Sequence, residues 1–152
     1  MTFSKKLLLL LLLSFVYLQD CSKAQDLYNN GMYLDAYGEI LDLGDNVYND
    51  EDCTLLAYNI LFKLEKFNES KSYLDKLFSF SPKSIEYNNL SSLLTKVLQN
   101  YKSAKYTLEK IDVDDAINEY NEILKDDELK NISLFYSGLG MAYKKKFMNS
   151  TN

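Results

Sequence analysis

The feature that most constrains the fold of this 152-residue chain is an amphipathic pattern that returns in the same register after 34 residues. Apolar or small residues recur at helical spacing in two segments, which predicts two helices that each bury one face. An amphipathic pattern alone drifts and need not return in register, so the shared offset indicates a repeated pair of helices. The four matched pairs are Tyr33 with Phe67, Ala36 with Ser70, Ile40 with Leu74, and Leu43 with Leu77.

A third copy of the pattern follows at an offset of 46, so twelve additional residues separate it from the second copy. No glycine or further proline interrupts the apolar period between residues 82 and 110, which favours one helix of about 28 residues. A kink near residues 88–89 or near Asn100, splitting this segment into two helices, is the alternative. The third copy consists of Val113, Ala116, Tyr120 and Ile123.

The last predicted helix runs from Leu129 to Phe147 and is followed by a polar tail, residues 148–152. A large residue, a leucine, a glycine and a tyrosine stand on one face of it at Tyr136, Leu139, Gly140 and Tyr143. We expect Gly140 to let a neighbouring helix approach closely. This helix either closes the array by hiding its last apolar face or ends a truncated piece of a longer array.

Together these segments resemble the tetratricopeptide repeat (TPR), a pair of antiparallel helices about 34 residues long. The resemblance covers residues 25–147 and implies an all-α fold of TPR-like antiparallel helix pairs, about six or seven helices forming a short right-handed solenoid. Tyr58 departs from the family by standing where a small residue belongs, and the twelve-residue excess is a second departure. Small residues occupy the family's small positions at Ala36, Ser70 and Ala116 in second helices, and at Ala104 and Gly140 in first helices.

In this family the first helix of each pair lines a concave surface that binds a peptide or a partner helix. Members that clamp a carboxylate terminus use a set of cations and Asn; here only Asn59 and Lys105 are similar, and Leu55 stands where a cation would be. The resemblance therefore implies protein binding without that specificity. The groove-facing candidates that it implies are Leu55, Asn59, Phe62, Tyr101, Lys105, Leu108, Ser137, Met141 and Lys144.

The N-terminus has the pattern of a cleavable secretory signal. Lys5 and Lys6 precede an apolar run that begins at Leu7, and small residues stand three residues and one residue before a cut between Ala24 and Gln25. The apolar run is shorter than the roughly 20 residues that span a bilayer as a helix. We therefore predict a signal peptide at residues 1–24 and an exported protein, periplasmic, at the cell surface or secreted.

The alternative is a lipoprotein anchored to a membrane through Cys21. Leu18 fits a lipoprotein signal, but Asp20 replaces the small residue usual before the cysteine. Contact with a membrane is expected only in that case. If the cut falls after Ala24, the exported chain keeps Cys53 as its one cysteine, with no internal disulfide, and Cys53 is then interpreted as a small apolar filler.

Several classes of function are disfavoured. A net charge of −5 and the absence of a basic groove disfavour nucleic acid as a partner. Catalysis, a cofactor and a metal site are not expected, because no phosphate loop, zinc spacing or dinucleotide fingerprint is present. The carboxylates of Asp114–Asp115 and Asp126–Asp127 are interpreted as helix caps or solvated groups. The acidic loop at residues 45–52 lacks the spacing of a calcium loop and is expected to favour the N-terminus of the next helix.

The sequence thus predicts an exported scaffold that binds a peptide or helix of a partner protein, in cell-envelope assembly or secretion. The alternative is a self-associating structural protein, or the truncated sensor or input module of a longer repeat protein. The oligomeric state and the identity of the partner stay open.

Overall fold

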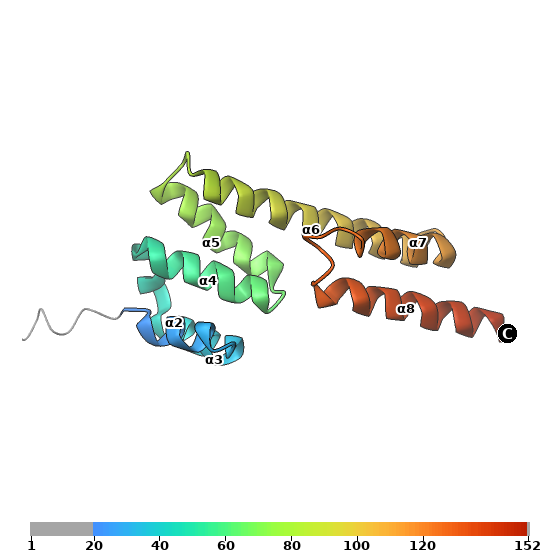
Figure 1. Cartoon of the computed structure of the whole chain (residues 1–152), viewed down its shortest axis with the longest axis horizontal. Coiled ribbons are helices and arrows are strands. Elements are labelled where there is room, and N and C mark those ends of the chain that lie inside the picture. The colour runs from blue at the N-terminus through green and yellow to red at the C-terminus, as the bar shows by residue number, and fades with distance from the viewer. Residues whose placement is uncertain (1–19, 152) are drawn as a thin grey trace, which may run out of the picture. The chain divides into compact units, whose positions relative to one another are not determined.

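The computed structural model describes residues 20–151, and all regular structure in that range is helical. The prediction of an all-α fold is confirmed for these residues. Residues 1–19, which hold most of the predicted signal peptide, lie outside the described range. The helices are α2 (Ser22–Asn29), α3 (Tyr33–Leu43), the 3-10 helix η1 (Gly44–Asn49), α4 (Glu51–Lys63), α5 (Phe67–Phe80), α6 (Ile85–Lys110), α7 (Val113–Ile123) and α8 (Ser133–Ser150), as Figure 1 shows.

The chain divides into two compact units between Pro82 and Lys83. Unit one holds α2 to α5, and unit two holds α6 to α8. None of the helices in the described part of the chain is long and apolar enough to cross a membrane.

Unit one consists of two helix pairs, α2 with α3 and α4 with α5, and α3 also packs on α4. The loop before α4 is tied down by polar groups. Thr54, which is fully buried, donates its hydroxyl to the carbonyl oxygens of Val47 and Asp50, both at 2.7 Å. The Asp50 carboxylate accepts the Cys53 N–H at 2.8 Å, so an acid of this loop caps the next helix as predicted. The core residues of this unit include Ala24, Ala36, Ile40, Val47, Leu56, Ala57 and Ile60.

The turns after α2 and α4 repeat one another at the predicted 34-residue offset. In each, a backbone N–H reaches back five residues, and the residue before the donor, Gly31 or Glu65, has a positive φ of 76° or 57°. This is the Schellman closure of a helix, which satisfies carbonyls that the helix leaves unpaired. The same five-residue bond recurs after α6, at the 46-residue offset. The three bonds join Met32 to Leu27, Lys66 to Leu61, and Asp112 to Thr107, at 2.9, 2.9 and 3.2 Å.

A disulfide between Cys21 and Cys53 connects the start of α2 to the first turn of α4, with the two Cα atoms 5.6 Å apart. Cys53 is therefore not simply an apolar filler in this chain. A chain cut after Ala24 would lose Cys21 and the first residues of α2, and Ala24 itself is buried in the core. A lipid thioether on Cys21 would use the same sulfur, so neither processed form can contain this bond.

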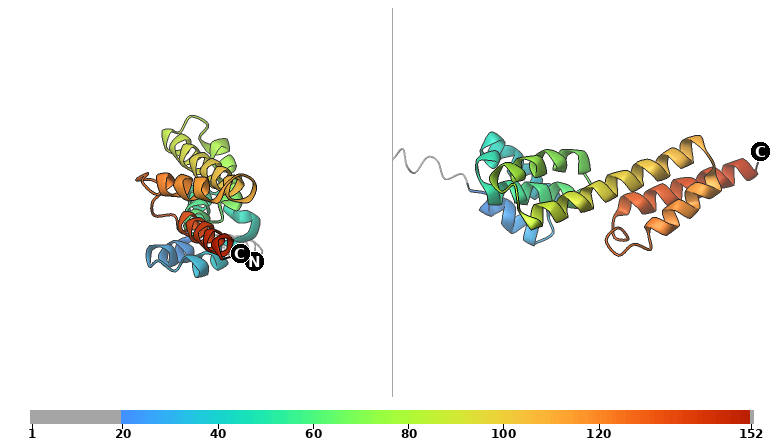
Figure 2. Two further views of the ribbon diagram at one scale, coloured as in Figure 1. Left: turned by 90° about the vertical axis from the view of Figure 1, so that its right-hand side faces the viewer. Right: turned by 90° about the horizontal axis from the view of Figure 1, so that it is seen from above.

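Unit two is a bundle in which α6, α7 and α8 all contact one another (Figure 2). Helix α6 is continuous over 26 residues, which confirms the single long helix and excludes the alternative of two helices separated by a kink. Its N-cap is Ser84, whose hydroxyl accepts the Tyr87 N–H at 3.2 Å. Helix α8 begins at Ser133 instead of Leu129, because residues 124–132 form turns, with Asp126 accepting the Glu128 N–H at 2.9 Å. It ends at Ser150 instead of Phe147, so it takes in most of the predicted polar tail.

The close approach predicted at Gly140 occurs at Gly138 instead. A methyl group on Gly138 would lie 2.4 Å from Tyr120 Cζ, whereas one on Gly140 would meet no atom within 4 Å. The prediction for Gly140 is wrong because two residues turn a side chain through about 200° around a helix. Gly138 also keeps the repeat register, since it follows Ala104 by 34 residues. The residues of this register, all buried, are Ala24, Tyr58, Ala104 and Gly138.

Candidate partner-binding surface

The three candidates in unit one lie on a single face of α4, at Leu55, Asn59 and Phe62, and all three are half-buried. Phe62 packs against its neighbours, with ring centroids 5.2 Å from Phe67 and 5.9 Å from Tyr58. Tyr58 itself is buried, and burial raises the pKa of its hydroxyl to about 12. Part of the Phe62 ring is therefore used in contacts within unit one.

The candidates on α6 divide into one core residue and two surface residues. Leu108 is 9% exposed and contributes to the core of unit two, so little of its side chain can touch a partner. Tyr101 is half-buried, and the Lys105 ammonium lies 5.8 Å from the centre of its ring. Lys105 also lies 3.9 Å from the carboxylate of Glu109. This places a cation and an aromatic ring together on α6.

The candidates on α8, Ser137, Met141 and Lys144, are all exposed. They follow one another at four and three residues and so share one face of the helix. The lysines that follow hold α8 in the bundle: Lys145 donates to the Leu108 carbonyl oxygen and Lys146 pairs with Asp114, both at 2.6 Å. This row is the most accessible of the three.

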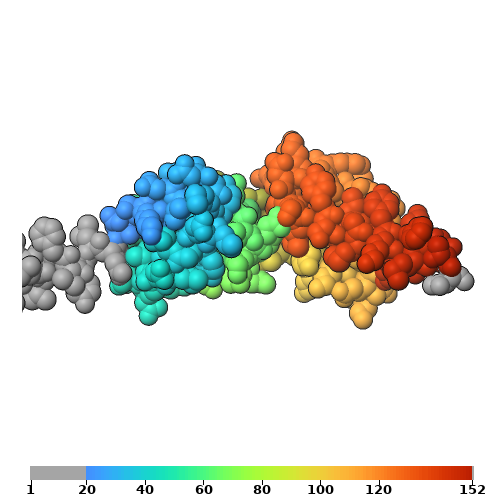
Figure 3. Space-filling view, turned by 90° about the horizontal axis from the view of Figure 1, so that it is seen from below, coloured from blue at the N-terminus to red at the C-terminus, as the bar shows by residue number. Residues whose placement is uncertain are grey.

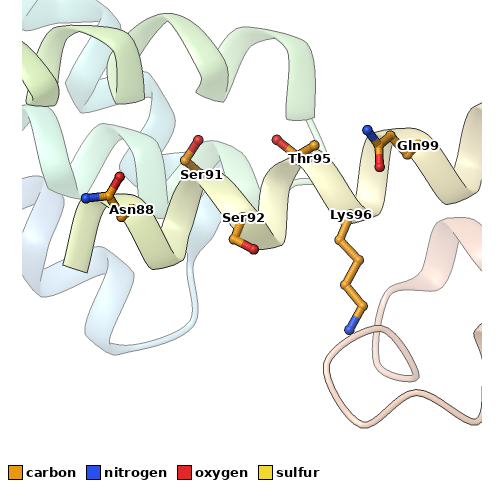
Figure 4. A pocket seen from close by; sticks show the side chains of 6 residues that line it. All are labelled: Asn88, Ser91, Ser92, Thr95, Lys96 and Gln99. Carbon is orange, nitrogen blue, oxygen red and sulfur yellow. The ribbon is translucent and has the colours of Figure 1, made fainter. Parts of the chain in front are cut away.

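A polar depression of about 480 Å³ lies on α6, apart from all nine candidates (Figure 4). Its lining consists of amides, hydroxyls and one ammonium, which can hydrogen-bond a peptide backbone but supply no nucleophile with a base. Sequence reasoning missed this stripe, although polar residues recur at helical spacing opposite the apolar ones. The lining residues are Asn88, Ser91, Ser92, Thr95, Lys96 and Gln99.

Lys96, one of the lining residues, extends toward the loop before α8 (Figure 4). Its ammonium lies 2.6 Å from the carboxylates of both Asp126 and Glu128. The hydrogen bond from Lys96 holds the pKa of Asp126 below its ordinary value, and the bonds to Asp126 and Glu128 raise the pKa of Lys96. Asp126 therefore anchors the loop, and its charge is already paired.

Two of the other carboxylates considered in the sequence form ion pairs: Asp114 with Lys146 and Asp127 with Lys130, both at 2.6 Å. The cap of α7 is the preceding residue, Asp112, whose carboxylate accepts the N–H groups of Asp114 and Asp115 at 2.7 and 3.1 Å. Within residues 20–151, the one cluster of three potential metal ligands is Cys21, Asp50 and Cys53. Both sulfurs of that cluster are joined in the disulfide, so the cluster has no thiolate to offer.

Comparison of the chain with protein-family models, with curated proteins and with solved structures finds no match. Any function must therefore be inferred from the described residues themselves. They provide an accessible row on α8, a cation and a ring on α6, and a polar depression on the same helix.

Proposed function

We propose that this protein is an exported, TPR-like scaffold that binds a peptide or a helix of a partner protein and performs no chemistry. The observation that carries the proposal is the recurrence of one helix-closing turn at an offset of 34 residues, and of its five-residue hydrogen bond at a further offset of 46. Arrays of antiparallel helix pairs present rows of side chains from successive first helices, and such rows bind extended peptides or helices. In this proposal the solenoid is short, and each unit has its own binding residues, on α4 in unit one and on α6 and α8 in unit two.

The chemistry of the accessible residues supports a protein ligand. Met141 supplies an adaptable apolar contact, and Lys105 and Lys144 supply cations that suit an acidic segment. The depression on α6 adds donors and acceptors at the spacing of a helix face. The matching ligand is a peptide or amphipathic helix with acidic residues beside one or two apolar anchors.

Export is part of the proposal and is supported by the N-terminal sequence pattern. The disulfide is a separate argument that applies only to a chain that keeps Cys21 with a free thiol. Disulfides persist in oxidising compartments and are rare in the cytosol, so that form of the chain also suits a periplasmic, surface or secreted location.

The experiment is quantitative co-purification of the exported protein from its own envelope and culture medium. The test variant is Met141→Glu with Lys144→Glu, and the control is Leu34→Glu with Lys71→Glu, which makes the same charge change at exposed sites of unit one. We expect one stoichiometric partner with the wild type and the control, and a loss of at least tenfold with the test variant. Circular dichroism checks that both variants stay folded.

Two outcomes contradict the proposal. One is that the wild type brings down no stoichiometric partner from any fraction. The other is that the test variant and the control retain the partner equally, which would place the binding surface elsewhere.

A further inference from the structure

A second row on α8 is apolar, exposed and distinct from the proposed groove residues. It consists of Tyr136, Gly140, Tyr143 and Phe147, spaced by four, three and four residues, so it follows one face of the helix. The three aromatic side chains are 55%, 51% and 69% exposed. Figure 3 shows unit two from a side on which α8 is exposed to solvent. We call these four residues the aromatic row.

Gly140 in this row has no role within the described chain. It lies inside a helix, where glycine is less favourable than alanine, and a methyl group there would meet no atom within 4 Å. Gly138 in the same helix is required by the close contact with Tyr120. A glycine at the centre of an exposed aromatic row leaves room for a large side chain from another molecule.

The aromatic row is self-complementary about the middle of α8. The helix runs from Ser133 to Ser150, and the row is symmetric about its midpoint, between Met141 and Ala142. When two copies of α8 pack antiparallel across a two-fold axis at that point, Gly140 faces Tyr143 of the other copy, and Tyr136 faces Phe147. Gly140 of each copy then meets a ring of the other, and every contact occurs twice with the two copies exchanged, as in an isologous interface.

Charge favours the antiparallel arrangement over a parallel one. Lys144, Lys145 and Lys146 follow the midpoint of α8. A parallel pair would set these lysines beside their own copies and align the two helix dipoles, both of which are repulsive. The antiparallel pair places Lys144 near Leu139 of the other copy instead.

The area of the aromatic row suits a weak dimer. A fully buried aromatic side chain removes about 150–250 Å² from water, so three rings exposed by half or more contribute roughly 300–450 Å² per subunit. A stable interface needs about 800 Å² per partner. The area is therefore that of a weak interface, and we expect monomer and dimer to exchange.

We propose that the aromatic row of α8 is a homodimerisation surface, occupied by the same row of a second copy in antiparallel orientation. This proposal does not depend on the partner bound in the groove, because it uses a different face of α8 and a different set of residues. It explains both the exposed rings and the otherwise unused Gly140.

The test is sedimentation velocity of the exported protein from about 5 µM to 1 mM. We expect the wild type to approach twice the monomer mass, and Gly140→Lys to raise the dissociation constant at least tenfold by filling the space for Tyr143. The control is Gly38→Lys, which changes another exposed helical glycine with open space around it, in α3. It should dimerise as the wild type does.

A wild type that stays monomeric to 1 mM overturns the proposal. The aromatic row would then be a surface for a different protein or for lipid. Equal dimerisation of the wild type and Gly140→Lys overturns it as well. Orientation is tested by mixing Tyr136→Cys and Phe147→Cys chains under oxidation, which should give the mixed cross-link. A dominant cross-link between two Tyr136→Cys chains would overturn the antiparallel arrangement.

Discussion

Gly138 lies against the ring of Tyr120 so closely that a methyl group in its place would be 2.4 Å from Cζ and 2.6 Å from the hydroxyl oxygen. Tyr120 is fully buried between α7 and α8. Its ring cannot swing into solvent without opening the bundle. The contact therefore fixes how close these two helices come.

Gly138→Ala should destabilise unit two by about 1–3 kcal/mol, because overpacking a filled core displaces side chains and backbone. Gly140→Ala is the matched control, since its methyl group enters open space and alanine favours the helix by about 1 kcal/mol. Urea unfolding of both variants measures the difference. Equal stabilities would show that Tyr120 moves aside freely, against the geometry described.

Gly31→Ala should destabilise unit one by about 1 kcal/mol, because Gly31 has a φ of 76° in the turn after α2 and a side chain is strained there. Gly38→Ala, in the middle of α3, should instead gain up to about 1 kcal/mol. The two free energies of unfolding are compared in urea. A neutral Gly31→Ala would contradict the left-handed turn.

The disulfide should contribute about 3–4 kcal/mol to a chain that retains Cys21, because it closes a loop between residues 32 apart. Chains beginning at Asp20 and at Gln25 are unfolded in urea with and without dithiothreitol. The longer chain should lose stability on reduction and the shorter should not respond. Insensitivity of the longer chain would mean that the bond does not constrain it. The intact mass of the exported protein shows which of the two forms a cell makes.

The pairing of Lys96 with Asp126 should make unit two sensitive to acid. The folded-state pKa of Asp126 is lowered from 3.8 by Lys96. Its contribution is therefore fully present above pH 3.8 and is lost as the pH falls through the lowered value. Lys96→Met should abolish this part of the acid dependence, and Lys71→Met, at an exposed pair within α5, should leave it unchanged. Unfolding between pH 2 and 7 measures both, and parallel curves for wild type and Lys96→Met would contradict the assignment.

The start of three helices could be predicted from the sequence. Helices α3, α5 and α7 begin at the first residues of their apolar rows, Tyr33, Phe67 and Val113. The continuity of α6 followed from the lack of a breaker. Periodicity could not give the face of α8 that meets α7, because apolar residues surround that helix on every side. The sequence pattern therefore predicted the close helix contact at Gly140, whereas in the structure this contact is made at Gly138.

Other features depended on local polar groups or on distant pairing. The start of α8 is delayed to Ser133 by turns that Asp126 stabilises. The disulfide between Cys21 and Cys53 was not predicted, because the signal-peptide pattern places Cys21 and Ala24 in a segment that is cleaved off. The depression on α6 was not predicted, because its lining residues are polar and helical periodicity indicates only that such residues face solvent.

The most direct test of the proposed scaffold is photo-crosslinking in the living cell, with a photoreactive amino acid at Met141 and, as control, at Leu34. Both side chains are exposed, by 53% and 70%. The account predicts a discrete adduct with a different protein from position 141, beside an adduct with a second copy across the proposed two-fold axis, and no adduct with a different protein from position 34. No adduct from position 141, an adduct only with a second copy of this chain, or the same adducts from both positions would contradict it.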